Sequence, residues 1–198
     1  MRPKTFDQTQ ALEAAMLQFW ESGYEGSSMQ NLVDRMGISR QSLYDTYGNK
    51  RELFEAALRR YREEVIVPAL AELADPSRTP TDLIRDHLLA IADGRERMPV
   101  GCLVVRTATE ISVEDAAIGE MLNDCVVEAL EAIERVIRRG QQSGEFDVRR
   151  SARELAASVI ASGMGLHVMR RLPGQGRAVR PSVDSLVEGL QGPPRTVA

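Results

Sequence analysis

A short stretch of hydrogen-bonding side chains carries the clearest chemistry in this sequence. Its members are Arg40, Gln41, Ser42, Tyr44 and Thr46. Arginine can form two hydrogen bonds with the major-groove edge of guanine, and glutamine can do the same with adenine. Because Leu43 and Tyr47 are spaced to point inward from a helix, the five polar residues are predicted to form an outward face. Such a face could bind the edges of DNA bases.

Two short helices joined by a tight turn must position this face. Ser28 is a good N-cap for the first helix, and Gly37 can end it in the left-handed conformation. Ser39 then caps the second helix, which carries the polar face. Asn49 and Glu52 fit a capping box that opens a further helix. The pattern indicates a helix-turn-helix, whose second helix enters the major groove.

The composition is that of an ordinary globular protein. The chain has 198 residues, of which 43% are hydrophobic and 27% charged. We expect no membrane span and no signal peptide, because no apolar run is long enough and the first ten residues lack an apolar core. Two cysteines, Cys102 and Cys125, fit a reducing compartment. These observations predict a cytoplasmic protein.

The charge distribution permits DNA binding without favouring it strongly. The net charge is −4, and residues 1–50 are not basic overall. Residues 35–62 hold an excess of basic side chains, and hydroxyl groups and helix N-termini can also bind phosphate. We therefore expect a modest affinity for DNA of arbitrary sequence.

The remaining chain reads as helices, so the predicted fold class is all-α. Residues 101–111 could be a strand by composition, but their helical surroundings favour a short helix. Pro68 could kink the helix after Asn49. The other predicted helices cover residues 6–22, 81–94, 114–140, 151–172 and 182–190, with a loop over 173–181. The predicted domains are an N-terminal helix-turn-helix domain (1–50), a C-terminal helical domain for effector binding and dimerisation (51–192), and a disordered tail (193–198).

The segment from Ala14 to Phe54 resembles the tetracycline-repressor (TetR) family of bacterial regulators. The shared features are the Phe19 to Gly23-Tyr24 spacing, the Gly37-Ile38-Ser39 turn, the Leu43-Tyr44 pair and the helix start at Asn49-Lys50 with Leu53. The resemblance is specific over the first third of the chain. Beyond it, the chain resembles the family as an all-helical domain of suitable length.

The resemblance implies particular contacts with DNA. Tyr44 and Lys50 would bind phosphates, with Ser28 assisting at a helix N-terminus. The residues expected at base edges are Arg40, Gln41, Ser42 and Thr46, with Gln30 of the preceding helix beside them. Asp45 departs from the polar or basic residues usual on that helix, and phosphates would repel its carboxylate.

The resemblance also implies a small-molecule pocket and a homodimer. In the family the last two long helices form a four-helix interface with those of a partner, a role that residues 151–172 and 182–190 fit. Residues 99–110 resemble a stretch of some effector domains. The candidate ligand-binding residues are His87, Met98, Cys102, Arg106, Met121, Met164 and His167.

Other chemistry finds less support in the sequence. Cys102 could act as a nucleophilic thiolate, although a buried, inert cysteine is the simpler interpretation. The spacing of the histidines and cysteines matches no metal-ligand pattern, so we expect neither a metal nor a cofactor. The sequence has no phosphate-binding glycine loop, nucleophile elbow or HExxH motif, and we expect no enzymatic activity.

These observations predict a homodimeric, ligand-responsive transcriptional regulator, and we expect a repressor. An effector bound within residues 82–160 would favour a dimer whose DNA-binding helices are wrongly spaced for the operator, and the helix over 49–70 would transmit the change. The alternative is a DNA-binding regulator without a small-molecule pocket, controlled by a reactive Cys102 thiol or by a protein partner.

Overall fold

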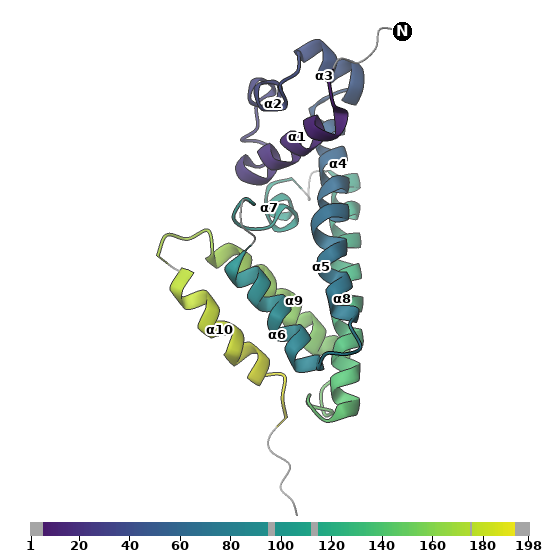
Figure 1. Cartoon of the computed structure of the whole chain (residues 1–198), viewed down its shortest axis with the longest axis vertical. Coiled ribbons are helices and arrows are strands. Elements are labelled where there is room, and N and C mark those ends of the chain that lie inside the picture. The colour runs from purple at the N-terminus through teal and green to yellow at the C-terminus, as the bar shows by residue number, and fades with distance from the viewer. Residues whose placement is uncertain (1–5, 95–97, 112–114, 175, 193–198) are drawn as a thin grey trace, which may run out of the picture. The chain divides into compact units, whose positions relative to one another are not determined.

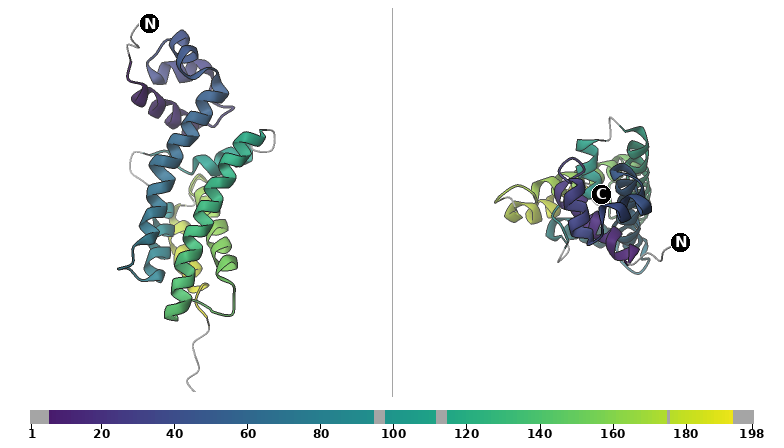
Figure 2. Two further views of the ribbon diagram at one scale, coloured as in Figure 1. Left: turned by 90° about the vertical axis from the view of Figure 1, so that its right-hand side faces the viewer. Right: turned by 90° about the horizontal axis from the view of Figure 1, so that it is seen from above.

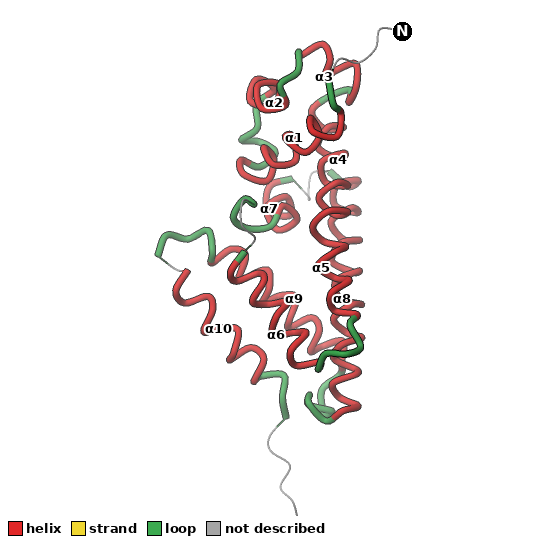
Figure 3. The backbone as a smooth tube through the Cα atoms, in the orientation of Figure 1, coloured by secondary structure: helices red, strands yellow, loops and turns green. Residues whose placement is uncertain are grey.

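Every regular element in the described part of the chain is a helix, which confirms the predicted all-α class (Figures 1 and 3). The computed structural model describes residues 6–94, 98–111, 115–174 and 176–192. It divides into two compact units. Unit 1 combines Met1–Ile66 with Cys102–Asn123, and unit 2 combines Val67–Gly101 with Asp124–Ala198. The predicted tail lies outside the described residues, and the division into domains at residue 50 stays a prediction.

Unit 1 begins with three capped helices: α1 (Gln8–Ser22), α2 (Met29–Met36) and α3 (Arg40–Tyr47). The predicted caps of α2 and α3 are confirmed. The Ser28 hydroxyl accepts a hydrogen bond from the Asn31 N–H, and that of Ser39 accepts one from the Ser42 N–H. Gly37 ends α2 with φ 65° and ψ 29°, in the left-handed region where glycine meets no Cβ penalty. These local signals fix the predicted helix-turn-helix.

A longer helical run starts at the predicted capping box of Asn49 and Glu52. It consists of α4 (Lys50–Tyr61), the π-helical η1 (Arg62–Ile66), α5 (Val67–Ala71) and the 3₁₀ turn η2 (Glu72–Ala74). Pro68 has no N–H, and its ring would clash with the Glu64 carbonyl of a regular α-helix. The wider turn of η1, which contains Glu64, accommodates this clash. The residues before Pro68 are thus π-helical, and the kink expected at Pro68 stays a prediction.

An aromatic core joins α1 to α4 in unit 1. The rings of Phe19 and Phe54 meet edge to face with centroids 4.8 Å apart, and Tyr24 lies 5.0 Å from Phe54. Trp20 and Tyr61 form a second edge-to-face pair. Figures 1 and 2 both show α1, α2 and α3 gathered about the N-terminal end of α4. The unit is completed by α7 (Leu103–Glu110), which confirms the predicted short helix and packs on α1 and α4.

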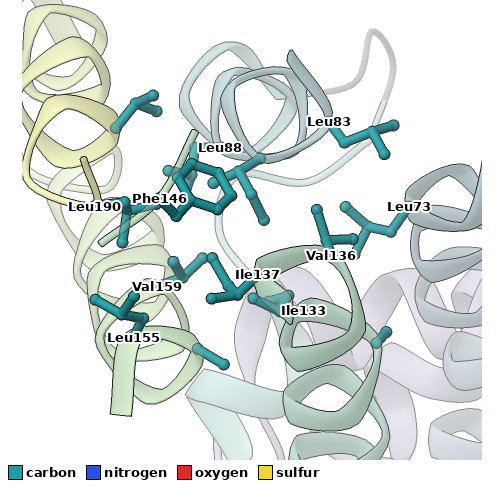
Figure 4. Close-up of a cluster of buried hydrophobic side chains, with 14 of the residues drawn as sticks. Leu73, Leu83, Leu88, Ile133, Val136, Ile137, Phe146, Leu155, Val159 and Leu190 are labelled. Atoms are coloured by element: carbon teal, nitrogen blue, oxygen red, sulfur yellow. The ribbon is translucent and has the colours of Figure 1, made fainter. Parts of the chain in front are cut away.

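Unit 2 is built from α6 (Pro80–Asp93), most of α8 (Ala116–Ser143), α9 (Ala152–Met169) and α10 (Gly176–Glu188). Side chains from α6, α8 and α9 converge in one apolar core, among them Leu88, Ile137 and Val159 (Figure 4). α10 packs on α6 and α9. In the described part of the chain, no helix is both long and apolar enough to span a lipid bilayer.

The predicted loop over residues 173–181 is wrong in its second half, because α10 begins at Gly176 and contains Pro181. Pro181 is the sixth residue of α10, where a proline removes one backbone hydrogen bond and crowds the preceding turn. Val179, Val183 and Val187 recur every fourth residue and are almost fully buried. Their burial extends the apolar face of α10 through the proline.

Candidate nucleic-acid interface

The N-terminal part of α3 presents the polar face that the sequence predicts. Arg40, Gln41 and Tyr44 are exposed, with Tyr44 exposing 44% of its surface, whereas Leu43 between them is fully buried. Ser42 is half-buried, and its backbone N–H is bound by the Ser39 cap. Among the described residues, no carboxylate lies within ion-pairing distance of Arg40. Its guanidinium is thus available to a base or a phosphate.

Thr46 departs from the expected outward orientation. Its hydroxyl oxygen is buried and has no hydrogen-bond partner. Thr46 follows the buried Leu43 by three residues, and residues three apart lie on the same face of a helix. In this conformation the hydroxyl of Thr46 does not reach a base edge.

Two glutamines of the interface are held by aspartates one turn later. The Gln41 side-chain amide donates a hydrogen bond of 2.7 Å to Asp45 on α3. Gln30 donates a similar bond of 2.8 Å to Asp34 on α2. The amide nitrogen of each of these glutamines, which are predicted to contact bases, therefore faces an aspartate.

The expected phosphate-binding groups Ser28 and Lys50 both have partners within unit 1. The Ser28 hydroxyl accepts the Asn31 N–H in the capping box, which leaves the other N–H groups of the first turn of α2 for an anion. The Lys50 ammonium lies 4.3 Å from the centroid of the Tyr24 ring, a cation–π contact. This contact positions Lys50 beside the helix-turn-helix and leaves its N–H donors to other partners.

A basic side chain near the interface is neutralised. Arg35 at the end of α2 pairs with Glu21 of α1. The hydrogen bond from Arg35 lowers the pKa of the Glu21 carboxyl below its usual value. The excess of basic residues over 35–62 therefore overstates the charge available to DNA.

Sequence reasoning missed the residues that connect α7 to α1 in unit 1. Arg106 on α7 donates hydrogen bonds to the carbonyl oxygens of Glu21 and Ser22, at 3.0 and 2.7 Å. It also pairs with Glu110 at 2.8 Å, and Glu110 accepts the Tyr24 N–H at 2.8 Å. Both residues are therefore bound to the C-terminal end of α1 and the turn that follows it. No sequence pattern signals contacts between segments this far apart in the chain.

A second connection of this kind involves Arg51 of α4 and Asp115. Arg51 donates a hydrogen bond of 2.8 Å to the Asp115 carboxylate just before α8. This bond and that from the Ile118 N–H lower the pKa of Asp115 to about 2. The Asp115 carboxylate is therefore ionised near neutral pH, the state in which it pairs with Arg51.

The seven candidate ligand-binding residues belong to two different units. Unit 2 contains His87, Met98, Met164 and His167, and unit 1 contains Cys102, Arg106 and Met121. In unit 1, Arg106 is engaged with Glu110 and α1. The members of unit 2 are each half-buried.

His87 and His167 are the notable members of the set in unit 2. Burial lowers the pKa of His87 to about 4. Burial, with smaller contributions from Arg170 and His87, lowers that of His167 to about 4 as well. The Nδ1 atom of His167 is buried without a hydrogen-bond partner. Unit 2 thus contains two neutral imidazoles, one of which has an unsatisfied polar atom.

Cys102 lies at the N-cap of α7, and its sulfur accepts a hydrogen bond of 3.3 Å from the Tyr61 hydroxyl. Burial raises the pKa of the thiol, although this bond and two backbone N–H groups oppose the shift. Since the thiolate is the reactive form, this environment does not favour the thiol-switch hypothesis. Among the described residues, no three side chains of suitable type are grouped to bind a metal.

Two family models match the chain. The model described as "Bacterial regulatory proteins, tetR family" matches residues 11–57, which include α2 and α3. The model described as "Tetracyclin repressor-like, C-terminal domain" matches residues 82–186. Together they span both units.

Similar proteins of known name are bacterial regulators. The HTH-type transcriptional repressor ComR of Escherichia coli is 29% identical over 169 residues, covering 83% of this chain and 80% of ComR. The uncharacterized HTH-type transcriptional regulator YezE of Bacillus subtilis is 31% identical, covering 74% of this chain and 76% of YezE.

A solved structure extends the similarity to nearly the whole chain. It is that of a cysteine mutant of the TetR family transcriptional regulator CifR, complexed with 26-base-pair double-strand operator DNA. It superposes with a TM-score of 0.83 at 28% identity, covering 96% of this chain and all of the other.

Proposed function

The chain belongs to the TetR family of bacterial regulatory proteins, and from that premise we propose that it is a cytoplasmic transcriptional repressor. It binds a near-palindromic operator as a homodimer, and a small-molecule effector releases it. The observation that carries this proposal is the exposed face of α3, where Arg40, Gln41 and Tyr44 project from a capped helix-turn-helix. As a regulator, the protein needs no catalytic residue or cofactor.

Each group of the interface has a distinct proposed role. Arg40 and Gln41 lie in the first turn of α3, the part of a recognition helix that contacts base edges. Tyr44 and Lys50 bind phosphates and set the position of α3 in the groove. The N-terminus of α2 behind Ser28 adds backbone N–H donors, to which a helix dipole attracts anions.

The proposed homodimer uses a face of α9 that bears small side chains. Ala157, Ala161, Gly165 and Val168 are exposed and recur at helical spacing. A Cβ atom added at Gly165 would meet no atom within 4 Å apart from its own stretch of helix. Small residues let two helices approach closely, and an uncharged, exposed stripe of them suits a symmetric interface.

The proposed effector site draws on unit 2, where His87 and His167 would supply polar contacts among apolar neighbours. Ligand sites are mostly apolar, with a few polar groups that fix orientation. The effector would act by binding one dimer state more tightly than the other, since only a difference in affinity shifts the equilibrium.

Binding of the purified protein to DNA upstream of its own gene, across a salt series, tests the proposal. Tyr44→Ala and Lys50→Ala should both weaken binding, but only Lys50→Ala removes a positive charge, so only this variant should make the slope of log K against log salt shallower, by about 0.9 for one phosphate. Tyr44→Phe and Lys50→Arg are the matched controls. Lys50→Arg should restore the wild-type slope of log K against log salt. Tyr44→Phe should not restore a hydrogen bond that the Tyr44 hydroxyl group makes. A folded dimer that binds no DNA with any preference would refute the proposal.

A further inference from the structure

A carboxylate on a DNA-reading helix repels phosphates, and α3 nevertheless carries Asp45. Among the described residues, Asp45 forms no ion pair, so a neighbouring cation does not explain it. Its hydrogen-bond partner is the exposed amide of Gln41, at 2.7 Å. Asp45 lies one helical turn after Gln41, the spacing at which glutamine and aspartate side chains meet on a helix.

We propose that Asp45 is the positioning residue of Gln41 and that the pair reads an adenine in each operator half-site. This inference rests on the proposed function, because it assigns a base to the interface described above. Asp45 touches no base in this arrangement. It acts by fixing which atoms of the Gln41 amide face the DNA.

The chemistry of the two groups determines that orientation. An ionised carboxylate only accepts hydrogen bonds, so the amide nitrogen of Gln41 must face Asp45. One N–H of that nitrogen and both lone pairs of the amide oxygen remain free. Adenine presents an acceptor, N7, beside a donor, the N6 amino group, in the major groove. The remaining N–H and the oxygen of Gln41 match this pair.

Fixing the amide also excludes other bases. Without Asp45, the amide nitrogen of glutamine can donate both of its N–H groups to the two acceptors of guanine, N7 and O6. With one N–H bound to Asp45, a single donor remains and the amide oxygen cannot pair with the second acceptor, so guanine is disfavoured. Asp45 thus weakens binding by repelling phosphates, but it increases the preference for adenine over guanine.

The position of Gln41 along α3 supports this assignment. Gln41 is the second residue of α3, within the N-terminal part of a recognition helix that contacts bases, whereas Asp45 is the sixth. Both side chains are exposed, so neither has a core position that explains its type. Gln30 and Asp34 repeat the arrangement on α2, at 2.8 Å. That pair provides a matched control.

Selection from a library of random double-stranded DNA tests the inference with the full-length protein. The wild type should enrich a symmetric site containing an adenine that Gln41→Ala no longer selects. Asp45→Asn keeps an acceptor for the Gln41 amide and removes the charge, so it should retain the adenine preference and bind all DNA more tightly. Asp45→Ala should also bind more tightly, but its preference for adenine should fall by roughly 5- to 150-fold, the range of one bidentate base interaction.

Asp34→Ala removes the same charge from α2 and should leave the adenine preference at this position unchanged. Retention of that preference in Asp45→Ala or in Gln41→Ala would overturn the inference. So would a cytosine preference that disappears in both Asp45 variants, since it would mean that the carboxylate itself accepts from the cytosine amino group. A wild type that enriches no sequence would overturn the proposed function, and this inference with it.

Discussion

The guanidinium group of Arg106 on α7 donates a hydrogen bond of 2.7 Å to the carbonyl oxygen of Ser22, the last residue of α1. The last carbonyl groups of a helix have no partner within it, and they form the negative end of its dipole. A positively charged donor at this point therefore caps α1. Because Arg106 also pairs with Glu110, which accepts the Tyr24 N–H, α7 holds both sides of the turn that leads into α2.

Removing this cap should destabilise unit 1. Arg106→Ala takes away two hydrogen bonds from a charged donor and leaves Glu110 without its cation. We expect the free energy of unfolding to fall by about 1.5–3 kcal/mol, the usual range for hydrogen bonds to charged groups. Urea unfolding followed by circular dichroism measures the change.

Arg59→Ala is the matched control for that measurement. Arg59 is exposed on α4, and its ion pair with Glu55 is long, at 3.7 Å. Its removal should change the free energy of unfolding by no more than about 0.5 kcal/mol. Equal effects of the two substitutions would mean that Arg106 is a surface residue like Arg59.

Alanine at Gly23 should cost more stability than alanine at Gly37. Gly23 has φ 80° and ψ 177°, a combination that is almost restricted to glycine, and a Cβ there would collide with Glu110. Gly37 has φ 65° and ψ 29°, and a Cβ there would meet no atom within 4 Å. We expect Gly37→Ala to cost about 1–2 kcal/mol from the backbone alone.

Thermal unfolding of the two alanine variants and of Gly37→Asn checks this order. Asparagine tolerates the left-handed conformation, so Gly37→Asn should cost less than Gly37→Ala. A smaller destabilisation by Gly23→Ala than by Gly37→Ala would show that the turn after α1 relaxes and that its contact with Glu110 contributes little.

The parts of the fold that were predictable from the sequence depend on neighbouring residues. Ser28, Gly37, Ser39 and Asn49 were all identified as caps because a capping interaction spans only three or four positions. Thr46 differs from the expectation on α3, because its polarity predicts an outward side chain, whereas its hydroxyl is buried. For Thr46, the helical period was the better guide.

Other features depend on contacts that no local pattern encodes. Arg106 bonds to Ser22, which lies 84 residues earlier, and Arg51 bonds to Asp115, 64 residues later. Each of these arginines is typical of a solvated helix face. The start of α10 was missed for a related reason, since the burial of Val179 against other helices outweighs the local preference of Pro181 for a loop.

The buried histidines of unit 2 should make the protein sensitive to mild acid. His87 and His167 have a pKa of about 4 in the folded state, against 6.5 for an ordinary histidine. As pH falls below 6.5 the unfolded chain binds protons that the folded chain does not, so the free energy of unfolding decreases towards pH 4. Above pH 6.5 this contribution is fully present. Between pH 7.5 and pH 5 the decrease should be on the order of 2 kcal/mol for each histidine.

Urea unfolding at these two pH values measures the decrease. His87→Gln and His167→Gln should each remove about half of the pH dependence, and the double variant should remove most of it, whatever its stability at pH 7.5. If the double variant keeps the wild-type difference between pH 7.5 and pH 5, other groups are responsible.

The α9 face offers a test of the proposed homodimer that leaves the protomer intact. Gly165 is exposed, and open space surrounds the position where a side chain would start. Gly165→Arg should therefore fold, and replacing glycine in a helix even favours the helical state by up to about 1 kcal/mol. At a close interface between two helices, however, the bulky charged side chain would clash with its symmetric copy and would have to shed its hydration.

Sedimentation velocity should show a dimer for the wild type and a monomer for Gly165→Arg, with unchanged helical content. Val148→Arg places the same charge at a position that is 62% exposed after α8, and it should remain dimeric. If Gly165→Arg is dimeric, the interface lies on another face of the protein. If the wild type is monomeric, the proposal of a homodimer is wrong.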